Sequence, residues 1–71
     1  MGNDEVARLL GSRVRAHRER AGLTQQALAR LAKVQQGQLS EIETADRVPT
    51  LSTIRKIAAA LEVPLRELLD G

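Results

Sequence analysis

The chain of 71 residues contains no cysteine and only one histidine, His17. Disulfide bonds and cysteine-ligated metals are therefore excluded, and a single histidine cannot build a metal site alone. A chain this short lies near the lower limit for a fold held by one hydrophobic core. We therefore expect one domain, residues 1–71, that is stabilised by apolar packing and needs neither a metal nor a cofactor.

Long apolar runs are also missing from the chain. No segment approaches the ~20 apolar residues that would span a bilayer. The acidic residues Asp4 and Glu5 lie where a signal peptide would be basic and then apolar. We therefore expect a cytoplasmic protein that has no contact with a membrane, and the lack of cysteine is compatible with such a reducing compartment.

The positive charge is modest but unevenly distributed. The formal net charge is +2, and the pI of 9.9 exaggerates it, because without tyrosine or cysteine almost nothing titrates between the carboxylates and the lysines. Between residues 8 and 20 the only acidic residue is Glu19, whereas the basic ones are Arg8, Arg13, Arg15, Arg18 and Arg20. This segment suits a polyanionic partner, although a solvated helix face would explain the same charges equally well.

The stretch TQQALARLAKVQQGQLSEIE, from Thr24 to Glu43, organises the rest of the chain. Its hydrophobic spacing predicts two short helices, residues 25–32 and 36–43, with Thr24 as an N-cap. Only three residues separate them, too few for the helices to lie side by side, so they must cross at a steep angle. This arrangement is a helix-turn-helix.

Hydrophobic spacing predicts further helices on both sides of this motif. A first helix, begun by Asn3 and ended by Gly22, would bury one stripe made of Val6, Leu10, Val14 and Ala21. A fourth helix is capped by Thr50 and a fifth starts near Pro64. The second to fourth helices would point inward Leu28, Leu31, Leu39, Ile42, Leu51, Ile54, Ile57, Ala58 and Leu61. Since no strand-like alternation appears, we predict a compact all-α fold of five helices.

Two residues of the first helix fall near its apolar stripe. Arg18 lies at the edge, and because burying an unpaired arginine costs several kcal/mol, it should have a carboxylate partner. Alternatively, its aliphatic stem lies on the core with the guanidinium in water. For His17 we favour a part-buried packing role over a ligand role.

The predicted helix 36–43 has a polar face opposite Leu39 and Ile42. Gly37, Ser40 and Glu41 lie there on a ~100° per residue wheel, flanked by Gln36 and Gln38. Glutamine pairs in a bidentate manner with adenine in the major groove, which makes this face a candidate DNA reader. Taken as a bare pattern, it is more often only solvated surface.

The segment GLTQQALARLAKVQQGQLSEIE, followed by a loop, Pro49 and TLSTIRKIAAALEVPLRELL, resembles the phage repressor and Cro type of helix-turn-helix, the XRE family. The resemblance covers about Gly11 to Leu69, with residues 1–10 as an N-terminal extension of the first helix. It implies a five-helix, lambda-repressor-like globule that binds double-stranded DNA as a homodimer, with the third helix in the major groove.

The resemblance also implies roles for individual residues. Gln25 would touch a phosphate and brace the third helix, and Arg18 matches an arginine that pairs with the equivalent of Glu43. The residues that read base edges would be Gln36, Gly37 and Glu41, with Gln38 and Ser40 beside them.

Four positions depart from the family pattern or fit it imperfectly. Lys33 and Ala45 replace glycines, so the backbone there either avoids the left-handed conformation or adopts it at a cost of roughly 1 kcal/mol or more. Gly37 offers no side chain to a base. Glu41 predicts either a contact to cytosine N4 or a salt bridge to a neighbouring basic residue.

Our working hypothesis is a sequence-specific transcriptional regulator, such as a repressor, on a near-palindromic operator. Phosphates would be bound by the N-termini of the second and fourth helices and by nearby arginines. These residues are Thr24, Gln25, Gln26, Thr50, Ser52, Thr53, Arg13, Arg15 and Arg47.

Two other functions are alternatives to a transcriptional regulator. The same fold could serve as a protein-interaction module, an antitoxin or adaptor. An enzyme is the weakest candidate, because we find no catalytic nucleophile and base, no metal ligand set and no phosphate-binding glycine loop. The residues Leu65, Leu68 and Leu69 could either form a dimer patch or close the core.

Overall fold

The computed structural model describes residues 2–69, and their side chains from Glu5 onward. Five helices account for most of this part: α1 (Gly2–Arg20), α2 (Gln25–Ala32), α3 (Gln36–Glu43), α4 (Leu51–Leu61) and α5 (Arg66–Leu69). No strand occurs among the described residues, so the predicted all-α fold is confirmed. The start of α1 lies ahead of the predicted cap Asn3, whose side chain is outside the described part.

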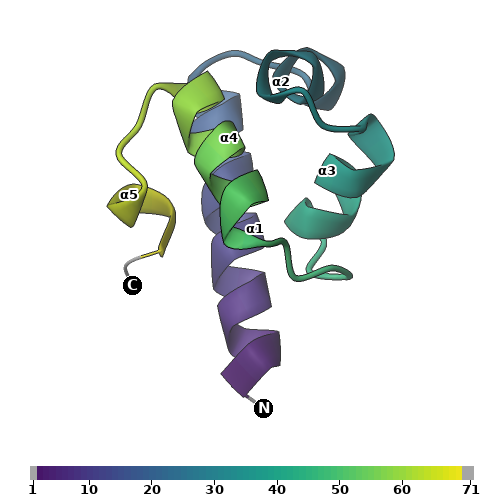
Figure 1. The fold of residues 1–71 in the computed structure, drawn as a ribbon, viewed down its shortest axis with the longest axis vertical. Helices are drawn as coiled ribbons and strands as arrows, with labels where there is room; N and C mark the ends of the chain where they lie inside the picture. Colours follow the sequence, from purple (N-terminus) through teal and green to yellow (C-terminus); the bar gives the residue numbers. More distant parts are fainter. Residues whose placement is uncertain (1, 70–71) are drawn as a thin grey trace.

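The helices are arranged around α1, with its N-terminal end protruding from the globule (Figure 1). α4 packs against α1. The helices α2 and α3 lie together on one side of this pair, and α5 lies on the other side. α2 and α3 cross at a steep angle, as the three-residue turn between them requires. The two faces of α1 therefore contact different helices, α3 and α5.

Aliphatic side chains from all five helices form the core. The largest fully buried ones are Leu28, Leu39, Ile42, Ile57, Leu68 and Val14. Four predicted core residues are instead exposed: Val6, Ala21, Leu31 and Leu51. Next to Val6 and Leu31, the alanines one or two positions away are buried instead: Ala7, Ala29 and Ala32. Small side chains at these contacts let the helices approach closely.

α1 and the end of α3 approach each other closely at Gly11. A Cβ atom at Gly11 would clash with the carbonyl oxygen of Ile42 and lie 2.9 Å from that of Glu43. Gly11 therefore allows backbone-to-backbone contact between the two helices, which fixes where α3 sits on α1.

The same kind of C-terminal turn ends α1, α2, α3 and α4. In each, a residue at the C-cap or just after it is left-handed, and the next amide donates to a carbonyl five residues back, as Asp46 N does to Glu41 O at 2.8 Å. Gly22 is the predicted glycine of this kind, with φ 75°. Lys33 (φ 59°) and Ala45 (φ 66°) adopt the left-handed conformation although they have side chains, and so does Glu62 (φ 59°), which the sequence did not single out.

The predicted N-caps of α2 and α4 are present. The hydroxyl oxygen of Thr24 accepts from Ala27 N at 3.0 Å, and that of Thr50 accepts from Thr53 N at 3.2 Å. Gln35, by contrast, precedes α3 without a capping side-chain hydrogen bond. Within residues 2–69, none of the helices has the length and apolar character that a bilayer crossing demands.

Candidate nucleic-acid interface

α3 presents a polar face to solvent. Leu39 and Ile42 are buried and anchor the helix on the core, whereas Gln36, Gly37 and Glu41 on the opposite side are exposed. Gln38 and Ser40 are half-buried at the two borders of this face. A Cβ at Gly37 would touch nothing within 4 Å, so the face is slim and open at its start. The five residues predicted to read bases thus share one accessible side of α3.

A buried ion pair sets the position of α3 on α1. Arg18 Nε donates to Glu43 Oε2 at 2.7 Å, and Arg18 Nη2 donates to Glu43 Oε1 at 3.1 Å. Only 12% of the Arg18 side chain and 3% of the Glu43 side chain are exposed. The hydrogen bond to Glu43 is the main reason that the pKa of Arg18 lies above its usual value, despite partial desolvation. Arg18 therefore stays charged and has the carboxylate partner that its position demanded.

Two further bonds complete this network. Arg18 NH1 donates to the carbonyl oxygen of Leu23 at 2.8 Å, just ahead of α2. Gln25 Nε2, in the first turn of α2, donates to Glu43 Oε1 at 3.1 Å. Glu43 is thus the point at which α1, α2 and α3 are joined by hydrogen bonds, and the angle between the two helices of the motif depends on it.

Glu41, on the exposed face, has a basic neighbour from the loop after α3. Arg47 Nε donates to Glu41 Oε1 at 2.8 Å, and about half of each side chain, 49%, is exposed. Of the two expectations for Glu41, the salt bridge to a nearby basic residue is therefore present in the protein without DNA. The same bond engages Arg47, which is also predicted to contact phosphate.

The α1 arginines point in different directions. Arg13 NH1 donates to the Glu67 carbonyl oxygen at 3.2 Å, on the α5 side of α1, and its Nε is buried with no partner among the described residues. His17 lies beside the same glutamate, with 3.7 Å between Nε2 and Oε1, and is mostly buried. His17 therefore packs as expected. The structure brings Arg13 to α5 and away from α3, and its phosphate contact stays a prediction.

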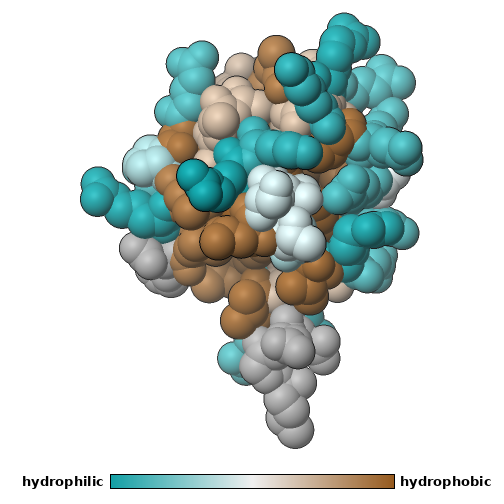
Figure 2. Space-filling model, in the orientation of Figure 1, coloured by the Kyte–Doolittle hydropathy of each residue, from teal (hydrophilic) through white to brown (hydrophobic). Residues whose placement is uncertain are grey.

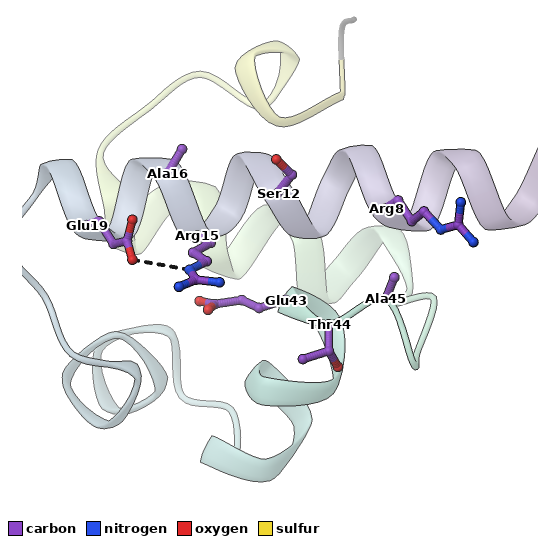
Figure 3. Close-up of a pocket in the computed structure, with 8 residues that line it drawn as sticks. All are labelled: Arg8, Ser12, Arg15, Ala16, Glu19, Glu43, Thr44 and Ala45. Carbon is purple, nitrogen blue, oxygen red and sulfur yellow. Dashed lines mark hydrogen bonds and ion pairs between the residues drawn. The ribbon is translucent and has the colours of Figure 1, made fainter.

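Arg15 and Arg8 instead line a groove between α1 and the end of α3 (Figure 3). Arg15 pairs with Glu19 at 3.2 Å and extends toward Glu43, and Thr44 lies across the groove. We had not proposed Arg8 as a site residue. Its spacing of seven from Arg15 places both on one helix face, and this signal could have identified it.

The N-termini of α2 and α4 carry a partial positive charge that no acidic residue of their own first turns offsets. Neither first turn contains an aspartate or glutamate. Gln26, Thr50 and Ser52 are exposed, and Gln25 and Thr53 are half-buried. A helix terminus of this kind, with free amides and exposed hydroxyl or amide side chains, is suited to bind an anion.

The geometry of α2 and α3 agrees with a comparison of the chain with known protein families. A family model described as helix-turn-helix matches residues 14–68. The chain belongs to this family, in its XRE type, whose members bind double-stranded DNA.

One solved structure is similar to this chain in both sequence and fold. The restriction-modification controller protein C.AhdI from Aeromonas hydrophila is 34% identical to this chain, with a TM-score of 0.86 over 87% of this chain and 94% of that one. A comparison with curated proteins gave no match. Family and structural likeness together support a DNA-binding transcription regulator.

Proposed function

We propose that this chain regulates transcription by sequence-specific binding to double-stranded DNA, with α3 in the major groove of a near-palindromic operator. The observation that carries this proposal is the polar face of α3, open to solvent and held by Leu39 and Ile42 on a rigid base. The likeness to a controller protein supports the regulatory role. Residues 1–71 would act as one binding unit, in which residues 1–10 extend α1.

Base recognition would fall to the exposed face of α3. The amides of Gln36 and Gln38 can each donate to and accept from a base edge, and Ser40 can do either. Gly37 would let the backbone approach the groove floor, since nothing surrounds it. Glu41 can only accept when ionised, which suits the amino group of cytosine.

Phosphate contacts would position α3 without reading sequence. The N-terminus of α2 would supply Thr24, Gln25 and Gln26, and that of α4 would supply Thr50, Ser52 and Thr53. Arg15 and Arg47 would add charge, because each guanidinium has donors beyond the one used in its ion pair. Arg13 is the third arginine predicted to add charge, and it would do so from the α5 side of α1, where one of its donors bonds to the Glu67 carbonyl oxygen.

Dimerisation would use the exposed apolar surface of α4 and the segment that follows it. Leu51, Ala59, Val63 and Leu65 line one shallow cavity together with Arg55, and apolar surface is visible on this face of the molecule (Figure 2). Leu68 belongs to the core, so the patch that we had considered at Leu65, Leu68 and Leu69 is split. Two copies would place their α3 helices one DNA turn, ~34 Å, apart.

Selection from random duplexes at two salt concentrations tests this function. Affinity should fall steeply as salt rises, because phosphate binding releases counterions. Gln36→Ala should cost about 1–3 kcal/mol at one base position and relax the preference there. If wild-type protein selects no sequence, or if a protein partner binds tightly and independently of DNA, the regulator proposal fails and the protein-interaction module gains support.

A further inference from the structure

The Glu41–Arg47 ion pair joins the face that would read DNA to a residue outside α3. A carboxylate on this face would lie close to the DNA phosphates. Their like charge would repel it and oppose its contact with a base. A half-exposed glutamate is also free to adopt several rotamers, whose loss opposes binding. The bond from Arg47 Nε to Glu41 Oε1, at 2.8 Å, acts against both effects, since it offsets the charge and orders the side chain.

The loop after α3 is built so that Arg47 can reach back to Glu41. The left-handed conformation of Ala45 reverses the chain, and Asp46 N donates to the Glu41 carbonyl oxygen at 2.8 Å. The hydroxyl group of Thr44 donates to Asp46 Oδ2 at 2.7 Å and stabilises the same turn. Arg47 is therefore held beside the last turn of α3 by backbone geometry, not only by its own side chain.

We propose that Arg47 is a positioning residue for Glu41, which orients the carboxylate to accept a hydrogen bond from the N4 amino group of cytosine. The inference rests on the proposed function and names a specificity determinant of the same site. Arg47 Nε donates a hydrogen bond to Oε1 of Glu41, which leaves Oε2 of the same carboxylate free to accept from the base. The other guanidinium donors of Arg47 remain available to a phosphate, so the two roles are compatible.

A phosphate contact alone would give a different result from a positioning role. The loss or gain of a phosphate contact changes the affinity for all DNA sequences to the same extent, and it changes how the affinity depends on salt. Positioning acts through Glu41 and changes the preference at one base pair. The two can therefore be separated by measuring preference and salt dependence in the same variants.

The experiment is selection from random duplexes with wild type, Glu41→Ala, Arg47→Ala and the double variant. Glu41→Ala identifies the base pair that depends on Glu41, where preference should fall by about 5- to 150-fold. Arg47→Ala should reduce preference at that same base pair by about threefold or more, and the double variant should lose no more there than Glu41→Ala. Arg15→Ala is the matched control, which should weaken binding to all sequences equally.

Several outcomes would overturn the inference. If Arg47→Ala lowers affinity evenly and flattens the salt dependence while the preference remains, then Arg47 is a phosphate contact only. If Arg47→Ala sharpens the preference, then the ion pair withholds Glu41 from DNA. Wild-type protein that selects no sequence would overturn the proposed function as well, which distinguishes the two failures. Since exposed ion pairs add little stability, the variants should fold, as the circular dichroism spectrum of each will verify.

Discussion

Three side-chain-bearing residues occupy left-handed positions after helices, where glycine is normally preferred. Glu62, after α4, is exposed and far from α3 in the chain, so its conformation can be tested without disturbing the binding face. Glu62→Gly should stabilise the fold by about 0.5–1 kcal/mol, because strain is relieved while the unfolded chain gains some entropy. Urea unfolding measures the change. Gly22→Ala should act in the opposite direction, and a loss of stability in Glu62→Gly would contradict the argument.

Alanine substitutions at two glycines within helices should change the stability of the protein in opposite directions. At Gly11, an added methyl group would meet the carbonyl oxygens of Ile42 and Glu43, which are backbone atoms and cannot easily move. Gly11→Ala should therefore destabilise the protein by more than about 2 kcal/mol. At Gly37 nothing lies within 4 Å, so Gly37→Ala should stabilise α3 by up to ~1 kcal/mol. Equal melting temperatures for the two variants would rule out the close contact of α1 with α3.

Residue-scale features were predictable from the sequence where the cause was local. Thr24, Thr50 and Gly22 have their expected roles, because capping depends on residue type and immediate neighbours. The partner of Arg13 was not predictable, since Glu67 lies 54 residues further along the chain. Nor could sequence alone decide the conformation at Lys33, where local strain competes with the packing of α2 and α3.

At the scale of helices, the Arg18–Glu43 pair should matter more for stability than any exposed ion pair. Arg18→Ala leaves a carboxylate that is 97% buried with only Gln25 as a side-chain donor, and we expect a loss of about 2–4 kcal/mol. Arg15→Ala breaks an exposed pair and should cost less than about 1 kcal/mol. Chemical denaturation of both variants gives the comparison. Similar losses in the two would show that Glu43 finds another partner.

The number, order and approximate bounds of the helices followed from hydrophobic period and capping residues. Which face of each helix is buried followed less well, as Val6, Leu31 and Leu51 show. A short helix has several apolar positions, and the identity of its neighbours decides which of them are covered. The exposed polar face of α3 was easier to locate, because its polar residues lie opposite two large aliphatic ones.

For the whole molecule, the exposed leucines give a test of the proposed dimer. Leu51 and Leu31 are almost equally exposed, at 57% and 58%, but only Leu51 lies in the proposed dimer patch. Leu51→Ser should raise the dimer dissociation constant by about tenfold, and Leu31→Ser should leave it unchanged. Sedimentation velocity over a range of concentrations measures both. If the two variants dimerise alike, the patch on α4 is not the interface.

The contact at Gly11 makes α1 and α3 move together, since no side chain separates their backbones there. α1 continues from this point to Gly2, nine residues further out, so it is a lever about 13 Å long. A rotation of α3 by roughly 10° would carry the outer end of that lever through about 2 Å. If α3 reads DNA as we propose, a spectroscopic label near Val6 would therefore report changes in the orientation of α3 on each DNA sequence from a point outside the groove.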